Sequence, residues 1–261
     1  MQHQKYKKRY SITAGDMDVN YRITPKAVLL YYQDCWACSM GKIHLAAFDI
    51  VKQNMLWVIT EFVSIFDNYD AFWSEEIEVT VWNSELTPLR LYTEFEVRKT
   101  NDNTLISHGY ASWSLLEKDT HKLVPTSAIA EKLTIIPELV TDGHKKQRFK
   151  QDGELCSTIN HKVNRINLDF NGHVNNRTYL DIAMQTPPKE IISTQQVNKL
   201  RIHWLQETFM GETLMCKLLK TDEDCYLATI NKDDGTQAAQ IYSEWCLQTY
   251  KKEISTDIDR I

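Results

Sequence analysis

The feature that most constrains the fold of this chain is an internal repeat. Three pairs of segments match in the same order in the two halves, and chance similarity of short strings rarely preserves order. The pairs are 16–29 with 167–180, 61–77 with 198–214, and 110–115 with 242–247. The sequence therefore predicts two tandem copies of one unit, residues 1–130 and 153–261, joined by a polar linker over 131–152.

Each copy is predicted to contain one helix followed by consecutive strands. In the first copy Thr24 is a suitable N-cap and Pro25 a first-turn residue, and apolar side chains then recur at intervals of three and four. In the second copy Asn175 or Asn176 can cap a helix that runs toward Ile191. After each helix the hydrophobic period drops to two, and turns such as TNDN and KDDG separate the strands. The expected strands lie near 6–14, 77–81, 89–97, 104–117, 157–165, 198–206, 212–220, 224–231 and 237–249.

This order of elements predicts an α+β fold. An early helix followed by several short-turned strands favours an antiparallel sheet that curves around the helix. That arrangement is the hot-dog shape, so two copies in one chain predict a tandem, or double, hot-dog fold.

Composition excludes several classes of function. With 261 residues, 43% of them hydrophobic and 25% charged, the chain can bury a substantial core. The formal net charge of −5 weighs against nucleic acid as the main partner. No stretch approaches the roughly 18 consecutive apolar residues of a membrane span, so membrane insertion is not expected. The polar start MQHQKYKKRYSIT predicts no secretory signal, and six scattered cysteines fit a reducing cytoplasm.

The motif CWAC, from Cys35 to Cys38, invites a redox or metal-binding interpretation. A redox pair of this spacing normally lies at the start of a helix, where the helix dipole lowers a thiol pKa. Here the helix is expected to begin well before the motif, at Pro25, so both thiols lie inside it. No second Cys or His pair follows at a ligand spacing. Buried helix thiols are the preferred interpretation, and neither a metal nor a cofactor is expected.

A cluster of polar residues marks the second copy. Asp169, Asn171 and His173 are spaced two apart just before the predicted helix. Alternate residues of an extended segment share a face, so these three groups could converge on one site. An imidazole titrates near neutrality, an amide can orient a substrate, and a carboxylate can act as a base or orient one. Backbone N–H groups near 172–174, ahead of the helix, would suit a developing oxyanion.

The first copy tests whether this cluster is only a helix-capping loop. Asp and Asn are favoured in turns for their own backbone hydrogen bonds. The first copy keeps Asp18 and Asn20 but carries Arg22 where the second copy has His173. An arginine cannot serve as a general base in a protein. If either copy is catalytic, it is therefore the second.

Other titratable residues are weighed against this cluster. Glu207 takes the place of Asp70 in the aligned segments, and we expect it to join the site. His203 shares the alternation face of Glu207 and is a weaker candidate. The remaining histidines lack an acidic or metal-ligand pattern nearby and are expected to be surface or core residues. They are His3, His44, His108, His121, His144 and His161.

These residues carry a family resemblance. The string LDFNGHVNN, followed by a tyrosine-containing helix and then a strand with a glutamate, resembles the acyl-acyl carrier protein (acyl-ACP) thioesterases of bacteria and plants. DMDVNYRIT, the LWV of 56–58 and the ASW of 111–113 look like the N-terminal half of that family, so the resemblance spans nearly the whole chain. It implies a double hot dog in which the first half shapes the acyl pocket and the second carries catalysis. By position, the catalytic residues of the family fall on Asp169, Asn171, His173 and Glu207.

The resemblance implies hydrolysis of fatty acyl-ACP to free fatty acid and carrier protein, with a phosphopantetheine-linked acyl chain as substrate. Plant members carry a cysteine directly after the glutamate, where this chain has Thr208, and the alignment thus excludes a thiol nucleophile. Attack by water is then the simplest mechanism, with Glu207 and either His173 or Asp169 as general base. Asn171 would orient the thioester or the water. The choice of base, the acyl chain length and the oligomeric state, a homodimer included, are left open.

Aromatic and aliphatic side chains of the first copy would line the acyl pocket. Each candidate, taken singly, is better explained as plain core, and the resemblance is what favours a lining role. The candidates are Trp36, Met40, Met55, Trp57 and Phe72.

Three other functions compete with acyl-ACP hydrolysis. An acyl-CoA thioesterase of the same fold differs only in the carrier. Hot-dog dehydratases and isomerases also pair a histidine with a carboxylate, but they usually place these groups on different copies or subunits, whereas three candidates share one loop here. A non-catalytic acyl-thioester-binding protein would need a partner or DNA-binding segment, for which the two predicted copies leave no spare residues.

Overall fold

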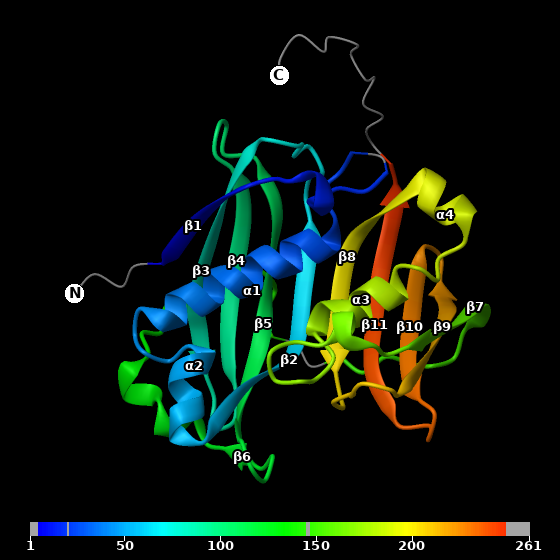
Figure 1. Cartoon of the computed structure of the whole chain (residues 1–261). Coiled ribbons are helices and arrows are strands. Elements are labelled where there is room, and N and C mark those ends of the chain that lie inside the picture. Colours follow the sequence, from blue (N-terminus) through cyan, green and yellow to red (C-terminus); the bar gives the residue numbers. More distant parts are fainter. Residues whose placement is uncertain (1–4, 20, 145–146, 249–261) are drawn as a thin grey trace.

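The computed structural model describes residues 5–19, 21–144 and 147–248. The strands within these residues form one continuous antiparallel sheet (Figure 1), in the order β1-β3-β4-β5-β2-β8-β11-β10-β9-β7, with β6 beside β5. The first half contributes β1 (Tyr6–Ser11), β2 (Met55–Phe66), β3 (Glu76–Leu86), β4 (Leu91–Lys99), β5 (Leu105–Glu117) and β6 (Leu123–Val124). The second half contributes β7 (Glu154–Lys162), β8 (Gln195–Trp204), β9 (Thr213–Asp222), β10 (Cys225–Lys232) and β11 (Gln237–Leu247).

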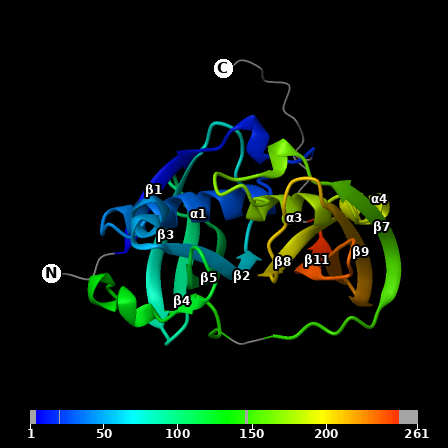
Figure 2. The same ribbon diagram turned by 60° about the horizontal axis from the view of Figure 1, so that its bottom comes forward.

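Helices cover one face of this curved sheet. In the first half α1 (Pro25–Gly41) lies across the concave face and is followed by the short α2 (Ala47–Ile50). In the second half α3 (Asn176–Ala183) takes the corresponding place, and the short α4 (Lys189–Thr194) lies beside the start of β8 (Figure 1). Figure 2 shows α1 and α3 on the same side of the sheet, with the strands curving beneath them. The halves are joined where β2 pairs with β8, from Glu61 opposite His203 to Ile65 opposite Lys199.

The long helix α1 begins and packs as its sequence predicts. The Thr24 side chain accepts a hydrogen bond from the N–H of Ala27 at 3.2 Å, and Pro25 is the first helical residue, so the predicted N-cap is confirmed. Its apolar side chains face the sheet and are buried in the core. They are Ala27, Val28, Leu29, Tyr32, Cys35, Trp36 and Met40.

The second-copy helix is shorter than predicted. Instead of running toward Ile191, α3 ends at Ala183, and α4 starts anew at Lys189 after Pro187 and Pro188. A proline lacks a backbone donor and its ring clashes with the preceding helical turn, so the proline pair prevents one continuous helix. The expectation of a single long helix in this copy is wrong for that reason.

The repeated polar loop has the same backbone structure in both copies. The N–H of Asp18 donates to the carbonyl of Arg22 at 2.8 Å, and the N–H of Asp169 donates to the carbonyl of His173 at 2.8 Å. Each loop is also closed by an internal β-bridge, Met17 with Ile23 in the first copy and Leu168 with Val174 in the second. The first alignment of the sequence therefore has a direct structural counterpart.

The second alignment has a structural counterpart as well. The Glu75 carboxylate accepts from the N–H of Phe72 at 2.8 Å, and the Glu212 carboxylate accepts from the N–H of Phe209 at 2.7 Å. Each of these glutamates also accepts through its carbonyl from the end of the first strand of its copy, at 2.9 Å in both cases. The segments that carry Asp70 and Glu207 are thus held to the first strand of their copies in the same way.

The CWAC motif lies inside α1, as expected. Cys35 is fully buried, and burial raises the pKa of its thiol to about 12, so the thiol stays protonated. Its sulfur donates to the carbonyl of Val79 at 3.4 Å. This environment is that of an inert structural thiol.

The described parts of the segment between the copies lie on the convex face of the sheet, opposite the helices (Figure 2). The indole N–H of Trp82 donates to the carbonyl of Glu138 at 2.8 Å, and His144 lies between two glutamates of the first half. Phe149 then stacks on His203 of β8. Among the described residues, no helix is long and apolar enough to cross a membrane.

Candidate active site

Two connections of the second half bring the predicted residues together. Asp169, Asn171 and His173 lie in the loop before α3, and Glu207 lies in the connection between β8 and β9. The N–H of Val174 donates to the carbonyl of Thr208 at 2.9 Å, which ties the loop directly to that connection. All four predicted catalytic residues are thereby placed at one end of the β2–β8 junction.

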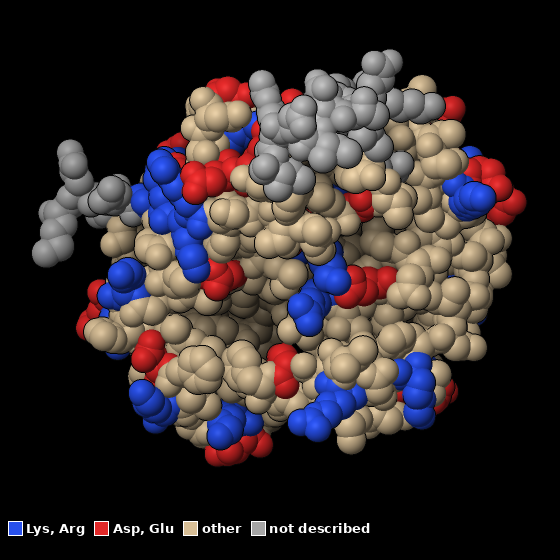
Figure 3. Space-filling model, turned by 45° about the horizontal axis from the view of Figure 1, so that its top comes forward, with Lys and Arg blue, Asp and Glu red and all other residues tan. Residues whose placement is uncertain are grey.

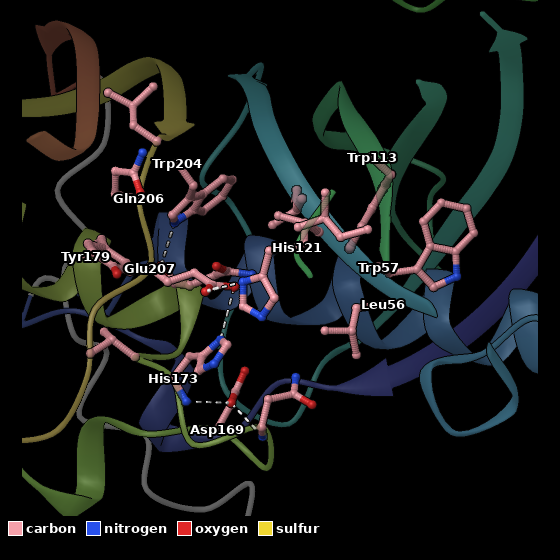
Figure 4. Close-up of a pocket in the computed structure, with 17 residues that line it drawn as sticks. Leu56, Trp57, Trp113, His121, Asp169, His173, Tyr179, Trp204, Gln206 and Glu207 are labelled. Atoms are coloured by element: carbon pink, nitrogen blue, oxygen red, sulfur yellow. Dashed lines mark hydrogen bonds and ion pairs between the residues drawn. The ribbon is translucent and has the colours of Figure 1, made fainter. Parts of the chain in front are cut away.

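Glu207 and His173 form the centre of the site. The Nδ1 atom of His173 lies 3.2 Å from Oε1 of Glu207, within ion-pairing distance, and both side chains are about a quarter exposed (23% and 30%). Figure 4 shows the carboxylate beside the imidazole, at the edge of a cavity that both residues line. A carboxylate beside Nδ1 favours the proton on that nitrogen and leaves Nε2 with its lone pair.

The Asp169 carboxylate is directed at its own loop. Its Oδ1 accepts from the N–H of Asn171 at 2.8 Å and from the N–H of His173 at 3.4 Å. In the first copy Asp18 accepts from the N–H of Arg22 at 3.1 Å in the same manner. The aspartate therefore shapes the turn that presents residue 173, in the copy with an imidazole and in the copy without one.

The backbone N–H groups expected to stabilise an oxyanion are already bonded. The N–H of Gly172 donates to the Asp169 carbonyl at 3.1 Å, that of His173 to the Asp169 carboxylate, and that of Val174 to Thr208. The prediction of an oxyanion hole at 172–174 is therefore wrong, because the turn and its tie to the neighbouring connection use all three donors.

Two other donors face the same cavity. Asn171 is exposed to it, and its side-chain amide makes no hydrogen bond within the described part of the chain. Asn176 is the first residue of α3 and also lines the cavity. The first N–H groups of a helix have no partner within the helix and attract negative charge.

Two adjoining cavities meet at these residues. One, of about 340 Å³, extends from the site along β2 and β8, and the other, of about 810 Å³, extends beneath α1 and α2 of the first half. Their shared lining includes His173 and Asp169 on one side and Trp57 and Trp113 on the other. Trp36 stacks on Trp113 at 3.7 Å and meets Trp57 edge-on at 5.4 Å, which makes an indole wall along the larger cavity.

The five proposed acyl-pocket residues divide into two groups. Trp36 and Trp57 line the larger cavity. Met40 and Met55 are buried in the core, and Phe72 lies in the connection between β2 and β3. These three are not among the residues that line either cavity.

Sequence reasoning missed a second imidazole beside Glu207. His121, in the turn between β5 and β6 of the first half, places Nδ1 3.2 Å from Oε2 of Glu207. His108 and His144 also have carboxylate partners, at 2.6 Å from Asp67 and 2.6 Å from Glu94. The expectation that these three histidines lack acidic neighbours is thus wrong, because their carboxylate partners lie in other strands or connections and are distant in sequence.

His203, the weaker candidate, lies outside the site. Its Nε2 is 3.1 Å from Glu61, and its ring stacks on Phe149 beneath the connecting segment. Trp204, the next residue of β8, lines the catalytic cavity. His203 therefore lies on the face of β8 opposite the one that lines the catalytic cavity.

In the first copy the position of the imidazole is filled by a fixed arginine. Arg22 is 6% exposed, and its guanidinium donates to Asp18 at 2.8 and 3.1 Å and to Gln196 at 3.0 Å. It also lies over the ring of Tyr69, at 5.8 Å from the centroid. These contacts hold the loop in place, and they leave almost none of the Arg22 side chain exposed.

The residue after Glu207 is unsuited to be a nucleophile. Thr208 is fully buried, and its hydroxyl accepts from Tyr179 at 3.0 Å. Burial raises the pKa of Tyr179 to about 12, so this hydroxyl remains a neutral donor. Cys216 lies in β9, and burial raises the pKa of its thiol to about 12. The described residues contain no cluster of three His, Cys, Asp or Glu side chains that could hold a metal ion.

Charged side chains are mixed on the face shown in Figure 3. Lysines and arginines alternate there with aspartates and glutamates rather than gathering in one basic field. A mixed surface of this kind lacks the electrostatic signature of a nucleic-acid interface on that face.

Comparison with known proteins identifies the family. Residues 3–132 match the acyl-ACP thioesterase N-terminal domain, and residues 151–247 match the acyl-ACP thioesterase C-terminal domain. The fold agrees: an acyl-ACP thioesterase from Bacteroides thetaiotaomicron superposes with a TM-score of 0.82 at 16% identity, over 92% of this chain and 97% of that one. The 12:0-ACP thioesterase from Umbellularia californica gives 0.81 at 16%, over 94% and 98%. The tandem hot-dog fold is confirmed, and the chain belongs to the acyl-ACP thioesterase family.

Curated relatives are longer than this chain. A chloroplastic acyl-[acyl-carrier-protein] hydrolase of Cuphea viscosissima is 22% identical over 208 residues, which are 74% of this chain and 49% of the relative. The corresponding shares of the next two relatives are 52% and 50%, so the chain spans about half the length of the proteins it matches.

Proposed function

We propose that this protein hydrolyses the thioester between a fatty acyl chain and the phosphopantetheine of acyl carrier protein, releasing free fatty acid. The observation that carries the proposal is the Glu207–His173 pair, at 3.2 Å, in which Glu207 lines the smaller cavity and His173 lines both cavities. Family membership supports the carrier protein as the partner. The activity, the partner and a cytoplasmic location are all part of the proposal.

In the proposed mechanism His173 is the general base. Both oxygens of Glu207 already face imidazole nitrogens, so the carboxylate fixes the tautomer and orientation of His173. Nε2 of His173 takes a proton from water as the water oxygen bonds to the acyl carbon. The carbon–sulfur bond then breaks, and the sulfur leaves as a thiol with the proton that His173 returns. Positioned proton transfer of this kind contributes about 10²–10⁴-fold.

The remaining site residues support that step. The Asn171 amide, with the first turn of α3 at Asn176, would hold the carbonyl oxygen as negative charge develops on it. Asp169 would keep the loop in the conformation that presents His173. The acyl chain would lie in the larger cavity against Trp36 and Trp57, with the carrier protein outside.

The decisive measurement is release of free thiol from a chain-length series of acyl-ACPs. We expect turnover by the wild type and a loss of about 10²-fold or more in kcat for Glu207→Gln and for His173→Gln. His203→Gln is the matched control, since it alters another imidazole–carboxylate pair outside the cavity, and should retain the wild-type rate. Binding of acyl-ACP without any turnover would instead indicate a non-catalytic acyl-thioester-binding protein.

Acyl-CoA is the alternative substrate, because a hydrolytic site of this kind acts on the thioester and not on the carrier. The same assay with acyl-CoAs of equal chain length separates the two. A higher kcat/KM for acyl-CoA at every chain length would show that CoA, and not the carrier protein, is the preferred carrier. The proposed hydrolytic mechanism would be unchanged.

A further inference from the structure

The turn between β5 and β6 holds a histidine in an unusual conformation. His121 has φ of 53°, in the left-handed region that non-glycine residues adopt sparingly. Its N–H donates to the carbonyl of Glu117 at 2.8 Å, and the N–H of Lys118 donates to Asn54 at 2.9 Å. The turn is thereby fastened to its own strand and to the segment before β2, and the backbone that carries the imidazole is held in place.

The imidazole of His121 lies beside the carboxylate of Glu207. The Nδ1 atoms of His121 and His173 each lie 3.2 Å from Glu207, the first beside Oε2 and the second beside Oε1. Figure 4 shows the carboxylate between the two rings, whose centroids are 6.4 Å apart. Lys118 and Asp169 are the other charged residues that line the cavity around His121. One carboxylate is therefore shared by imidazoles from the two halves of the chain.

We propose that His121 is a positioning residue that acts through Glu207. A glutamate side chain has several rotatable bonds, and Glu207 is 30% exposed, so a single contact would leave its carboxylate free to turn away. A second imidazole on Oε2 fixes the carboxylate plane and keeps Oε1 on Nδ1 of His173. Partners that orient a functional group in this way typically matter about 10- to 100-fold. This inference rests on the proposed function and adds that the site is assembled from both copies.

Two substitutions separate the imidazole from the backbone. His121→Gly removes the side chain at a position whose φ glycine adopts freely, so no backbone strain is added. His121→Asn retains an N–H donor close to the place of Nδ1 and also tolerates the left-handed region. We expect His121→Gly to lower kcat about 10- to 100-fold with little change in KM, and His121→Asn to recover most of the rate.

A double-mutant cycle tests whether His121 acts through Glu207. In a Glu207→Gln background, His121→Gly should change the rate by less than about threefold, because the group through which it acts is already neutral. Full, additive loss in that background would overturn the proposal. His108→Gly is the control, since His108 forms an equivalent pair with Asp67 in the same half and should leave the rate unchanged.

A measurement without substrate keeps this inference separate from the proposed activity. The imidazole ¹⁵N resonances of His173 should move in His121→Gly and stay in place in His108→Gly. If the resonances move but no acyl thioester is hydrolysed by the wild type, the proposed function fails while the positioning contact stands. If they do not move and kcat is unchanged, His121 has no positioning role.

Discussion

At the scale of single residues, the exchange of Arg22 for His173 distinguishes the polar loops of the two copies. The loops that carry Asp18 and Asp169 have the same backbone hydrogen bonds, yet the next critical side chain is Arg22 in one and His173 in the other. The arginine is buried against its own aspartate, whereas the imidazole faces a cavity. The same turn therefore holds a buried arginine in the first copy and presents an imidazole to a cavity in the second.

Arg22 is predicted to matter for stability and not for rate. Arg22→Leu removes the cation that Asp18 and Gln196 face, and Asp18 is only 32% exposed, so we expect a loss of about 2 kcal/mol in the free energy of unfolding. Arg22→Lys should recover only part of this, because lysine cannot form the same two-pronged contact. Urea denaturation measures the loss, and kcat should stay near the wild-type value. A collapse of kcat in a folded Arg22→Leu variant would contradict the division of labour between the copies.

Trp57 is predicted to limit the length of the acyl chain. Trp57→Leu removes part of the indole wall, and the preference in kcat/KM should shift toward longer chains by about tenfold, the scale expected when one methylene gains or loses a contact. Trp82→Leu is a matched control, because both indoles donate to a backbone carbonyl at 2.8 Å and Trp82 lies on the other face of the sheet. An unchanged length profile in Trp57→Leu would place the acyl chain elsewhere.

At the scale of elements, the connecting segment is held to the sheet by an ionisable group. His144 lies 2.8 Å from Glu85 and 2.6 Å from Glu94, and its ring stacks on Tyr92 at 4.1 Å. Burial alone would lower the pKa of His144, but the bonds to Glu94 and Glu85 outweigh it and raise the pKa above its ordinary value. Folding therefore favours the protonated imidazole.

This raised pKa predicts a pH-dependent stability. The contribution of His144 is fully present below the unfolded-state pKa of about 6.5 and is lost as the pH rises through the higher folded-state value. The free energy of unfolding should fall more steeply as the pH rises above about 6.5 in the wild type than in His144→Gln. His161→Gln is the control, because His161 has the neutral Asn167 as its partner. Equal slopes for wild type and His144→Gln would mean that the imidazole does not gain its proton on folding.

Sequence patterns predict the elements better than the contacts between them. The N-cap at Thr24, the two polar loops and the place of Glu207 follow from local residue types and from the repeat. The early end of α3 was also signalled locally, by Pro187 and Pro188. The hydrogen bond from the N–H of Val174 could not be foreseen in this way, because its acceptor, Thr208, lies in another connection. His121 was missed for the same reason, since its carboxylate partner belongs to the other half.

At the scale of the whole molecule, one sheet runs through both halves. At its centre Glu61, 7% exposed, lies 2.9 Å from Arg201 and 3.1 Å from His203, which joins β2 to β8 through side chains as well as backbone. A continuous sheet with a buried polar junction favours cooperative unfolding of the two halves over independent unfolding.

Glu61→Ala is predicted to destabilise both halves together. Removing one member of a buried ionic group costs about 3–5 kcal/mol, and hydrogen exchange should report the same loss for central amides of β4 and β10. Glu78→Ala, which removes an exposed partner of Lys7, should cost less than about 1 kcal/mol. Loss of protection in only one half of Glu61→Ala would show that the halves unfold independently.

The position of His121 has a consequence for recombining such proteins. A chimera that takes its first half from a relative would exchange the indole wall, and with it the chain-length preference, but it would also replace the β5–β6 turn. A chimera whose first half has no histidine at the position of His121 should gain the chain-length preference of the relative but have a lower kcat. Introducing a histidine at that position should then restore kcat, although every residue of the D-x-N-x-H loop already comes from this protein.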